Sequence, residues 1–471
     1  MVSNHRNILQ VNKSDIGGGA ANVAWNLFRS YKDRGHNAWM AVDQKLSTDP
    51  DVLLIENDRY RRLWALGCNS LADRITAEFA NTPAAKRIAY WVRRPIGQPD
   101  RFFRTLLGHE DFNYPGSCHF AELPEVQPDI IHTHNLHINY FNLGALPKLS
   151  AKYPFVMTLH DAWELSGHCA HSFDCQRWVT GCGDCPDLTI YPAIKRDATA
   201  NNWRRKKRIF SQTRLYITTP CNWLMDKVKK SILVEGIADI RVIHNGVDLT
   251  IFHPLDKNTA REQLGLPLDA SILLFAASGI REKKWRDYDA MRSAAKSVAD
   301  QNPDSNLLFI ALGEDAPYEK LDNLEIRFIP FTSDTTRVAA YFQASDLYIH
   351  ASRVDTFPTV ILEALTCGTP VIATRVGGIP EQVKALNSNG SDVSDYSPDE
   401  ATGILVAAGN TPQLASAITG LLDSDDLRIQ LGRNAAEDSV RRFDLKQQVD
   451  RYLSWYQDVI EDWQDNALPN N

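Results

Sequence analysis

RVDTFPTVILEALTCGTPVIA, residues 353–373, is the stretch of sequence that decides the fold of this chain. A short apolar run at 346–350 precedes this stretch, and another at 370–374 overlaps its end. Both have the length and composition of buried strands. Between them the pattern predicts a helix over about 358–367, because proline suits the first turn of a helix and Gly368 suits its left-handed end. The other apolar runs of the second half, separated by helical segments, extend this unit into a doubly wound sheet.

The start of this predicted helix is a candidate anion site. Its first turn is Pro358, Thr359 and Val360, where free N–H groups and the positive end of the helix dipole attract phosphate. Asp355 and Glu363 flank that turn, and carboxylates repel phosphate but accept hydrogen bonds from hydroxyls. A nucleotide-sugar, which carries phosphate between two hydroxyl-rich groups, satisfies both conditions. A capped helix with an exposed acid is the alternative interpretation.

Three adjoining segments resemble the signature of glycosyltransferase family 4: the acids at 355 and 363 around FPTVIL, then EALTCGTPVIAT, then VGGIPE at 376–381. The resemblance implies an α/β protein of the GT-B fold, with two Rossmann-like doubly wound domains facing across a cleft, and a reaction that retains anomeric configuration. It also implies that Glu363 accepts from the ribose hydroxyls and that Asp355 positions the transferred sugar. Donor binding is then assigned to the following residues: Asp355, Phe357, Pro358, Thr359, Val360 and Glu363. The family usually has Glu at both ends of the pair, and Asp355 is a departure that is also familiar from polysaccharide-biosynthesis branches.

The 471 residues, 44% of them hydrophobic, are enough for two or three cores. We expect an acceptor-side Rossmann-like domain over 1–250, a nucleotide-sugar-binding one over 251–442, and a C-terminal helix in 443–471 that crosses back to the first domain. A net charge of −7 argues against a nucleic-acid partner. The first residues lack the apolar core of a signal peptide and no 18-residue apolar run occurs, so we expect a cytoplasmic protein, with peripheral contact at the inner face of the membrane as one option.

A triple glycine in DIGGGAAN, residues 15–22, opens the first predicted helix after a strand. The spacing differs from the dinucleotide fingerprint, because Asn22 stands where the third glycine would be. A plain tight turn is one interpretation. In the family that the chain resembles, this loop lies close to the donor phosphates, which makes Gly18 and Gly19 donor-binding candidates.

Two predicted parallel strands, 128–134 and 154–160, end in histidine at the edge where open α/β sheets bind ligands. A single histidine at such a place is usually structural, and we interpret His132 and His134 in that way. His160 differs, because Thr-Leu-His-Asp resembles the family's strand end whose histidine reaches the transferred sugar. The resemblance therefore implies that His160 orients donor and acceptor hydroxyls.

A run of cations, SGIREKKWR at 278–286, follows an apolar strand and should lie beside the phosphate site. The family usually places Arg and then Lys-Gly here, and Lys284 occupies the position of that lysine. We assign pyrophosphate binding first to Lys284 and second to Arg281 or Lys283, with a solvated charge run as the alternative. Backbone N–H groups and Lys284 would stabilise the departing diphosphate, so we expect no metal and no other cofactor in catalysis.

Residues 166–186 form a loop that holds four of the eight cysteines. They are Cys169, Cys175, Cys182 and Cys185, with His168 and His171 as alternates. The closing Cys-x2-Cys pair is compatible with one structural zinc that has four thiolate ligands. A loop with reduced, partly buried thiols is the alternative.

A basic insertion at 57–118 interrupts the first domain. From Arg59 to Arg104 there are ten Lys or Arg against three Asp or Glu, with aromatic residues between them. Such a surface could contact anionic lipid or hold a lipid-linked acceptor that carries pyrophosphate. A solvated helical face is the commoner explanation of such a pattern.

Together these features predict a retaining glycosyltransferase that moves a sugar from a nucleotide-diphosphate sugar to a glycan or lipid-linked acceptor hydroxyl in cell-surface polysaccharide biosynthesis. Domain closure would exclude water and favour transfer over hydrolysis. A nucleotide-sugar epimerase or a phosphorylase of the same fold is an alternative enzyme. A non-catalytic nucleotide-sugar-binding partner of a polysaccharide assembly complex is an alternative from another class.

Overall fold

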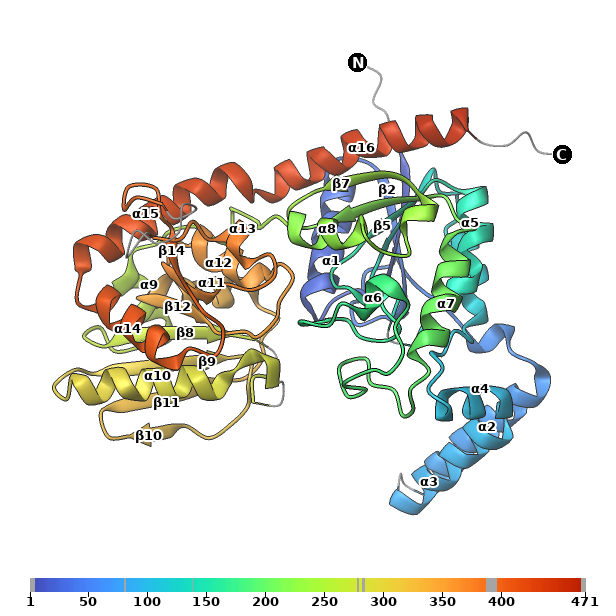
Figure 1. Ribbon diagram of the computed structural model, residues 1–471, viewed down its shortest axis with the longest axis horizontal. Helices are drawn as coiled ribbons and strands as arrows, with labels where there is room; N and C mark the ends of the chain where they lie inside the picture. The colour runs from blue at the N-terminus through green and yellow to red at the C-terminus, as the bar shows by residue number, and fades with distance from the viewer. Residues whose placement is uncertain are drawn as a thin grey trace. The chain divides into compact units, whose positions relative to one another are not determined.

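The computed structural model describes residues 5–79, 82–137, 139–277, 279–281, 284–386 and 396–466. The chain forms two compact units (Figure 1). Unit 1 comprises residues 1–219, Leu224–Val242 and Leu453–Asn471, and unit 2 comprises Pro220–Trp223 and Ile243–Tyr452. The candidate cation Lys283, residues 387–395 and the tail after residue 466 lie outside the described residues.

Unit 1 is built on a sheet of seven parallel strands in the order β3-β2-β1-β4-β5-β6-β7. Its strands are β1 (Asn7–Ser14), β2 (Asn37–Gln44), β3 (Val52–Leu54), β4 (Ile130–His134), β5 (Phe155–Thr158), β6 (Leu215–Thr219) and β7 (Ile237–Val242). Its main helices are α1 (Gly19–Asp33), α2 (Leu63–Glu78), α3 (Pro83–Trp91), α4 (Pro99–Leu106), α5 (Leu146–Lys152), α6 (Arg177–Thr180) and α7 (Thr199–Phe210), while α8 (Asn222–Val228) begins in unit 2. The central strands β4, β5 and β6 are buried along their whole length, as expected of a parallel sheet covered on both faces.

Unit 2 has a second seven-stranded sheet in the order β10-β11-β9-β8-β12-β13-β14, parallel except for the β10–β11 pair. The strands are β8 (Ser271–Ala276), β9 (Leu307–Leu312), β10 (Glu319–Leu321), β11 (Leu324–Ile329), β12 (Leu347–His350), β13 (Val371–Thr374) and β14 (Gly403–Val406). The helices are α9 (Lys257–Leu264), α10 (Tyr288–Gln301), α11 (Thr335–Ala344), α12 (Thr359–Thr366), α13 (Ile379–Gln382), α14 (Thr411–Leu422) and α15 (Asp425–Arg442). The predicted fold class, two doubly wound α/β domains, is confirmed.

The strand–helix–strand unit around residues 353–373 forms as the sequence predicts. Helix α12 begins at Thr359, with Pro358 at its N-cap. Gly368 follows the helix with φ 75°, the left-handed conformation that a glycine adopts at little cost. Strand β13 begins soon after this turn, at Val371.

The last helix, α16 (Leu445–Asp465), starts in unit 2 and continues in unit 1 from Leu453 onward. Trp455 and Tyr456 are fully buried, and the Trp455 indole N–H donates to Asp239 of β7 at 2.8 Å. An ion pair of 2.6 Å joins Asp462 to Arg214. Within the described ranges, no helix combines the length and apolar character needed to cross a bilayer.

Each sheet has a topological switch point, where successive strands leave one strand toward opposite edges. In unit 1 the strand β1 lies between β2 and β4, and in unit 2 the strand β8 lies between β9 and β12. Ligands of open α/β sheets bind in the crevice outside the carboxyl ends of such strands. The loops after β1 and β4, and after β8 and β12, are therefore the places to look for a site.

Candidate active site

The loop after β12 carries Asp355 and is fixed by the glycine turn that follows β13. A side chain at Gly377 would place its Cβ 1.7 Å from the carbonyl oxygen of Asp355, so only glycine fits there. The next residue, Gly378, donates its N–H to the Thr356 carbonyl at 3.0 Å. Asp355 itself accepts from the Thr356 N–H at 2.8 Å. The Val-Gly-Gly segment of the sequence signature therefore acts by holding this loop in place.

His350, the last residue of β12, connects the interior of unit 2 to Asp355. Its ring is buried, with Nδ1 3.1 Å from the Tyr348 hydroxyl and Nε2 3.1 Å from Ser352 Oγ. The same Nε2 lies 3.4 Å from Asp355 Oδ2. The carboxylate of Asp355 is thus oriented from behind by a buried side chain, an arrangement that the sequence did not reveal.

Helix α12 starts beside this loop. No side chain among the described residues caps it, and Thr359 and Val360 of its first turn are half-buried. Glu363, one turn further on, is also half-buried, and desolvation raises the pKa of its carboxyl to about 7. The side chain of Phe357 packs inside the unit, stacked on His244 with a ring-centroid distance of 5.3 Å.

The loop after β8 supplies the cations. Arg281 is exposed, and Glu314 accepts from the backbone N–H of Ile280 at 2.7 Å. Lys284 opens a short 3-10 helix, Lys284–Arg286, and its side chain lies outside the described part of the structure. A cavity of about 470 Å³ adjoins this loop. Its walls are formed by Ile280, Arg281, Asp287, Tyr288, Asp289, Arg292, Glu319 and Arg353.

Arg286 is a residue that the sequence analysis missed. Its Nε is buried and makes no hydrogen bond with any described residue. Burial lowers the pKa of its guanidinium, while the charges of Asp355 and Tyr348 act in the opposite direction. Arg286 belongs to the same basic run as Lys284, and nothing in the sequence pattern shows which of these cations turns toward Asp355.

In unit 1 the candidate residues are imidazoles. His160, two residues beyond β5, lies with Nε2 3.0 Å from Nδ1 of His134 at the end of β4. The amide nitrogen of Gln10 on β1 faces Nε2 of His134 at 3.3 Å. With the amide in this orientation, His134 accepts at Nε2 and donates from Nδ1 to His160. His160 then carries its own proton on Nδ1, away from His134.

Burial keeps these rings neutral. It lowers the pKa of His160 to about 4 and that of His132 to about 3, and it also lowers the pKa of His134. His132 is bonded on both sides, to Thr158 Oγ1 and to the Tyr456 hydroxyl, each at 2.6 Å. The structural role predicted for His132 therefore agrees with its contacts, whereas His134 contacts His160 directly.

A second polar group behind His160 was not anticipated. His137 Nε2–H donates to the Asp161 carboxylate across 2.8 Å, and that carboxylate outweighs burial to raise the pKa of His137. Burial and the charge of Asp161 raise the pKa of the Glu164 carboxyl to about 7. Oε2 of Glu164 is buried without a hydrogen bond to any described residue. The sequence gives no periodic signal that would single out His137 or Glu164.

The glycine-rich loop after β1 is held by Asp15, whose carboxylate accepts from the backbone N–H groups of Leu46 at 2.9 Å and Ser47 at 2.8 Å. Gly18 is the N-cap of α1 and Gly19 is its first residue. A Cβ built at either glycine would meet no described atom within 4 Å. The start of α1 is therefore open enough for a bound group.

The four cysteines of the 166–186 loop are free thiols. Burial raises the pKa of the Cys182 thiol to about 12 and also raises that of Cys169, and His168 Nε2 lies 3.4 Å from Cys185 Sγ. Among the described residues, however, no three His, Cys, Asp or Glu side chains converge closely enough to hold a metal ion. The thiols do not form a zinc site as they stand, and the structural zinc remains a prediction.

Two doubly wound domains, with loops at both switch points that carry these polar residues, define a GT-B protein. Family models agree: the one described as Glycosyltransferase Family 4 matches residues 17–251, and the one described as Glycosyl transferases group 1 matches residues 256–438. The chain belongs to the group 1 glycosyltransferases, as the resemblance of residues 353–381 had indicated.

Sequence relatives include a putative colanic acid biosynthesis glycosyl transferase, WcaC, of Escherichia coli, 26% identical over 70% of this chain and 77% of that one. A D-inositol 3-phosphate glycosyltransferase of Catenulispora acidiphila is 33% identical over 43% of this chain. An N-acetyl-alpha-D-glucosaminyl L-malate synthase of Bacillus anthracis is 30% identical over 49% of it. The last two alignments cover 47% and 56% of those relatives, or about half of their length.

Solved structures share the fold. A sucrose-phosphate synthase from Thermosynechococcus elongatus superimposes with a TM-score of 0.60 at 17% identity, over 97% of this chain and 100% of that one. Anabaena Alr3699/HepE, solved in complex with UDP and glucose, gives a TM-score of 0.58 at 15% identity, over 96% of this chain and 100% of that one. At these identities the likeness establishes the GT-B fold alone.

Proposed function

We propose that this chain is a retaining, metal-independent glycosyltransferase that moves a sugar from a nucleotide-diphosphate sugar to a glycan or lipid-linked acceptor hydroxyl in cell-surface polysaccharide biosynthesis. One observation carries the proposal. In each unit the loops at the switch point of a doubly wound sheet, where such sheets bind ligands, carry candidate residues. In unit 1 the candidate His160 lies in the neighbouring loop after β5 and contacts His134 at the end of β4. The name of the colanic acid relative and the UDP bound in the Anabaena structure support the same proposal.

The nucleotide half of the donor is assigned to unit 2. The N–H groups of Thr359 and Val360 face a bound diphosphate, and Lys284, Arg281 and Arg286 supply the positive charge that offsets it. Glu363 accepts from the ribose hydroxyls. Charge that develops on the departing diphosphate is then stabilised by fixed groups of the protein, which is why no divalent metal is needed.

The transferred sugar is assigned to Asp355 and His160. Since the pKa of His160 is about 4, its ring is neutral at pH 7 and acts through directed hydrogen bonds rather than through charge. The Nδ1–H of His160 donates to a sugar hydroxyl. Asp355, one methylene shorter than the usual Glu, reaches the sugar from the loop that Gly377 holds. The acceptor attacks from the face that the diphosphate leaves, without a protein nucleophile.

The first experiment identifies the donor. In a thermal-shift panel of nucleoside diphosphates and their sugars, the ligands of one base only should raise the melting temperature. A ligand present at a concentration of 100 times its Kd stabilises the folded state by about 2.7 kcal/mol. Turnover of that donor is then measured with a lipid-linked acceptor. Binding without turnover would identify a non-catalytic nucleotide-sugar-binding protein and would refute the proposal.

Lys284→Ala sharpens this test. We expect at least about tenfold weaker binding of the diphosphate, since a charge-assisted hydrogen bond contributes about 1.5–3 kcal/mol. Lys320→Ala, which removes an exposed lysine elsewhere in unit 2, is the matched control and should bind as the wild type does. Equal affinities for the two variants would remove Lys284 from the phosphate site.

A further inference from the structure

Residues 63–79 and 82–107 of unit 1, which we call the arm, bury small side chains and expose large apolar ones. The arm consists of α2, α3, a π-helical turn (Val92–Ile96) and α4. The buried residues of α2 are Ala65, Cys68, Asn69 and Ala72, and those of α3 are Ala85 and Ala89. Small side chains therefore fill the contact between the two helices, a place where large apolar residues normally lie. Figure 1 shows this hairpin extending away from the sheet of unit 1.

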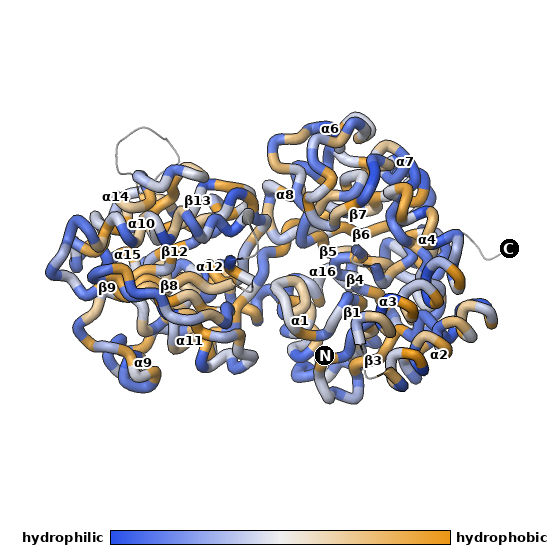
Figure 2. Tube along the Cα trace, turned by 90° about the horizontal axis from the view of Figure 1, so that it is seen from below, coloured by the Kyte–Doolittle hydropathy of each residue, from blue (hydrophilic) through white to orange (hydrophobic). Residues whose placement is uncertain are grey.

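The large apolar side chains of the arm are on its outside. Ten of the 25 large apolar residues that are exposed in the described part of the chain lie within the arm. Leu63 is 87% exposed, Trp64 65%, and Trp91 52%. Trp64 and Leu71, seven residues apart, lie on the same side of α2 by their helical spacing. Figure 2 shows hydrophobic residues along α2 and α3. A cluster of this kind marks a surface that meets something apolar.

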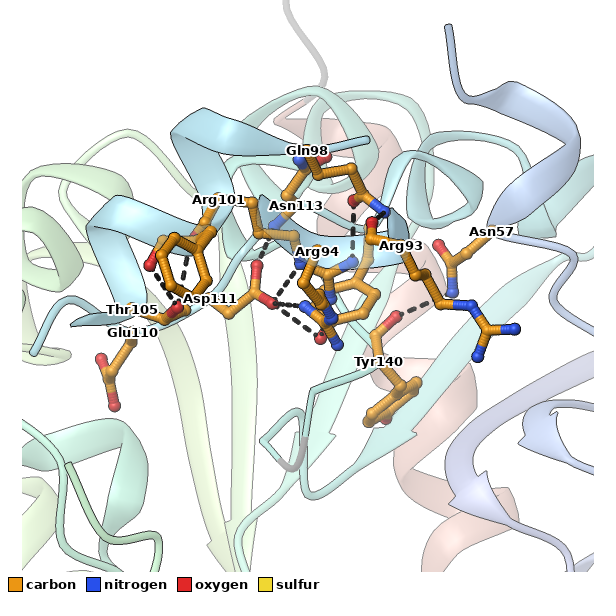
Figure 3. Close-up of polar contacts among 12 residues, drawn as sticks. Asn57, Arg93, Arg94, Gln98, Arg101, Thr105, Glu110, Asp111, Asn113 and Tyr140 are labelled. Atoms are coloured by element: carbon orange, nitrogen blue, oxygen red, sulfur yellow. Dashed lines mark hydrogen bonds and ion pairs between the residues drawn. The ribbon is translucent and has the colours of Figure 1, made fainter. Parts of the chain in front are cut away.

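The base of the arm is held by polar contacts instead (Figure 3). Arg101 is 5% exposed, and it is ion-paired to Asp111 and donates to Gln98 Oε1 at 3.0 Å. Tyr114 donates to the same Asp111 at 3.0 Å, and Arg94 lies 3.5 Å from it. The buried charges are thus paired, as they must be to offset desolvation. These contacts anchor the base of the arm without involving its exposed aromatic residues.

The outside of the arm is also basic. Five exposed cations form no ion pair with any residue that the structure describes. They are Arg62, which directly precedes the arm, and Arg74, Lys86, Arg87 and Arg104 within it. The Trp64 indole N–H already donates to the Ile96 carbonyl at 3.0 Å, so its ring can enter an apolar phase without an unsatisfied donor. Aromatic rings among long basic side chains match the boundary between headgroups and acyl chains, where the cations reach anionic phosphates.

We infer that the arm docks this chain to the surface of an anionic bilayer. Trp64, Leu71 and Trp91 enter the acyl boundary, and the five cations contact lipid phosphates. A face that merely met water would carry polar residues in these positions. The inference does not depend on the proposed function, because docking is a property of the arm and needs neither the donor nor the acceptor.

The test is flotation of the full chain with two kinds of vesicle, phosphatidylcholine alone and phosphatidylcholine with about one third phosphatidylglycerol. The wild type should float with the anionic vesicles only, and less so as salt shortens the Debye length from about 10 Å at 0.1 M to about 3 Å at 1 M. Arg74→Glu with Arg87→Glu should weaken binding by roughly 30-fold or more, from about 1 kcal/mol for each basic residue lost.

Trp64→Ser with Trp91→Ser should weaken binding about tenfold or more through lost apolar burial. Tyr318→Ser with Ile429→Ser, and Arg337→Glu with Arg433→Glu, change the same kinds of exposed residue in unit 2 and should float like the wild type. Circular dichroism and the donor-induced thermal shift should be unchanged in every variant, which separates docking from donor binding.

Two results would overturn the inference. The first is a wild type that does not float, or that floats equally well with neutral vesicles. The second is a dimer, seen by light scattering, that Trp64→Ser with Trp91→Ser abolishes while flotation is unchanged. That result would assign the outer face of the arm to a second copy of the chain.

Discussion

The candidate side chains at the strand ends of the two sheets differ in charge. After β4 and β5 in unit 1 the candidate residues are His134 and His160, imidazoles that burial holds neutral and that are bonded to each other. After β8 and β12 in unit 2 they are carboxylates and guanidinium groups beside a helix start. Unit 1 therefore offers directed hydrogen bonds and unit 2 offers charge. The chemistry that each unit can contribute follows from this difference: orientation of hydroxyls in unit 1 and neutralisation of phosphate in unit 2.

The largest expected effect separates the two roles. His160→Ala should lower kcat of sugar transfer by roughly 100-fold or more while the Kd of the nucleoside diphosphate stays the same, because the imidazole acts on the sugar. Steady-state kinetics and calorimetry with the diphosphate measure the two quantities. His119→Ala, which removes a half-buried histidine outside the site, should change neither. A variant that loses diphosphate affinity instead would place His160 on the nucleotide.

Glu363→Gln tests the proposed role of the Glu363 carboxylate of unit 2 in binding ribose. The amide keeps an acceptor for ribose but loses the charge-assisted bond, so we expect the Kd of the donor to rise roughly tenfold. Glu400→Gln, at an exposed carboxylate of the same unit, is the control. A ribose-free ligand such as pyrophosphate should bind both variants equally, and equal losses for both ligands would contradict the assignment to ribose.

The raised pKa of Glu363 gives the same site a pH dependence. Below a pKa of about 7 its carboxyl is protonated, and above it the carboxylate accepts hydroxyls, so donor affinity should rise roughly tenfold between pH 6 and pH 8. Glu363→Gln should flatten this profile. His160, with a pKa of about 4, should add no step over that range. A step that survives in Glu363→Gln would come from another group.

A smaller effect concerns Gln10, which acts on His160 only through His134. Nitrogen-15 NMR of the imidazoles should show both His134 and His160 protonated at Nδ1, and Gln10→Ala should mix the tautomers. We expect kcat to fall only about threefold to tenfold, with the diphosphate Kd unchanged. Nε2-protonated His160 in the wild type would contradict the direction of this hydrogen-bond chain.

The predicted zinc has the smallest expected effect on chemistry. If Cys169, Cys175, Cys182 and Cys185 bind one ion, elemental analysis of untagged protein should find about one zinc per chain, and chelation should loosen the 166–186 loop without releasing nucleotide. Zinc-free, fully active protein with four titrating thiols would leave reduced cysteines as the correct interpretation.

The local sequence pattern was enough to predict α12, its flanking strands and the glycine that ends the helix. These features follow from apolar periodicity and backbone preference over about 20 residues. It could not show that His134 meets His160, since that contact depends on the parallel register of β4 and β5. It also could not foresee that Tyr456 would bind His132 across the chain. Charge and composition indicated a basic insertion at 57–118, but which face of each of its helices would be buried was decided by tertiary packing.

Helix α16 has a consequence for synthesis on the ribosome. Unit 1 is complete only when residues from Leu453 onward return to it, after roughly 200 residues of unit 2 have been made. At about 5–20 residues per second this interval lasts roughly 10–40 s. During it His132 lacks its Tyr456 partner and the surface that covers Trp455 is open. The emerging chain must therefore hold a nearly finished first domain, with the surface that packs on Trp455 uncovered, while the second domain folds, and chaperones have that time in which to bind it.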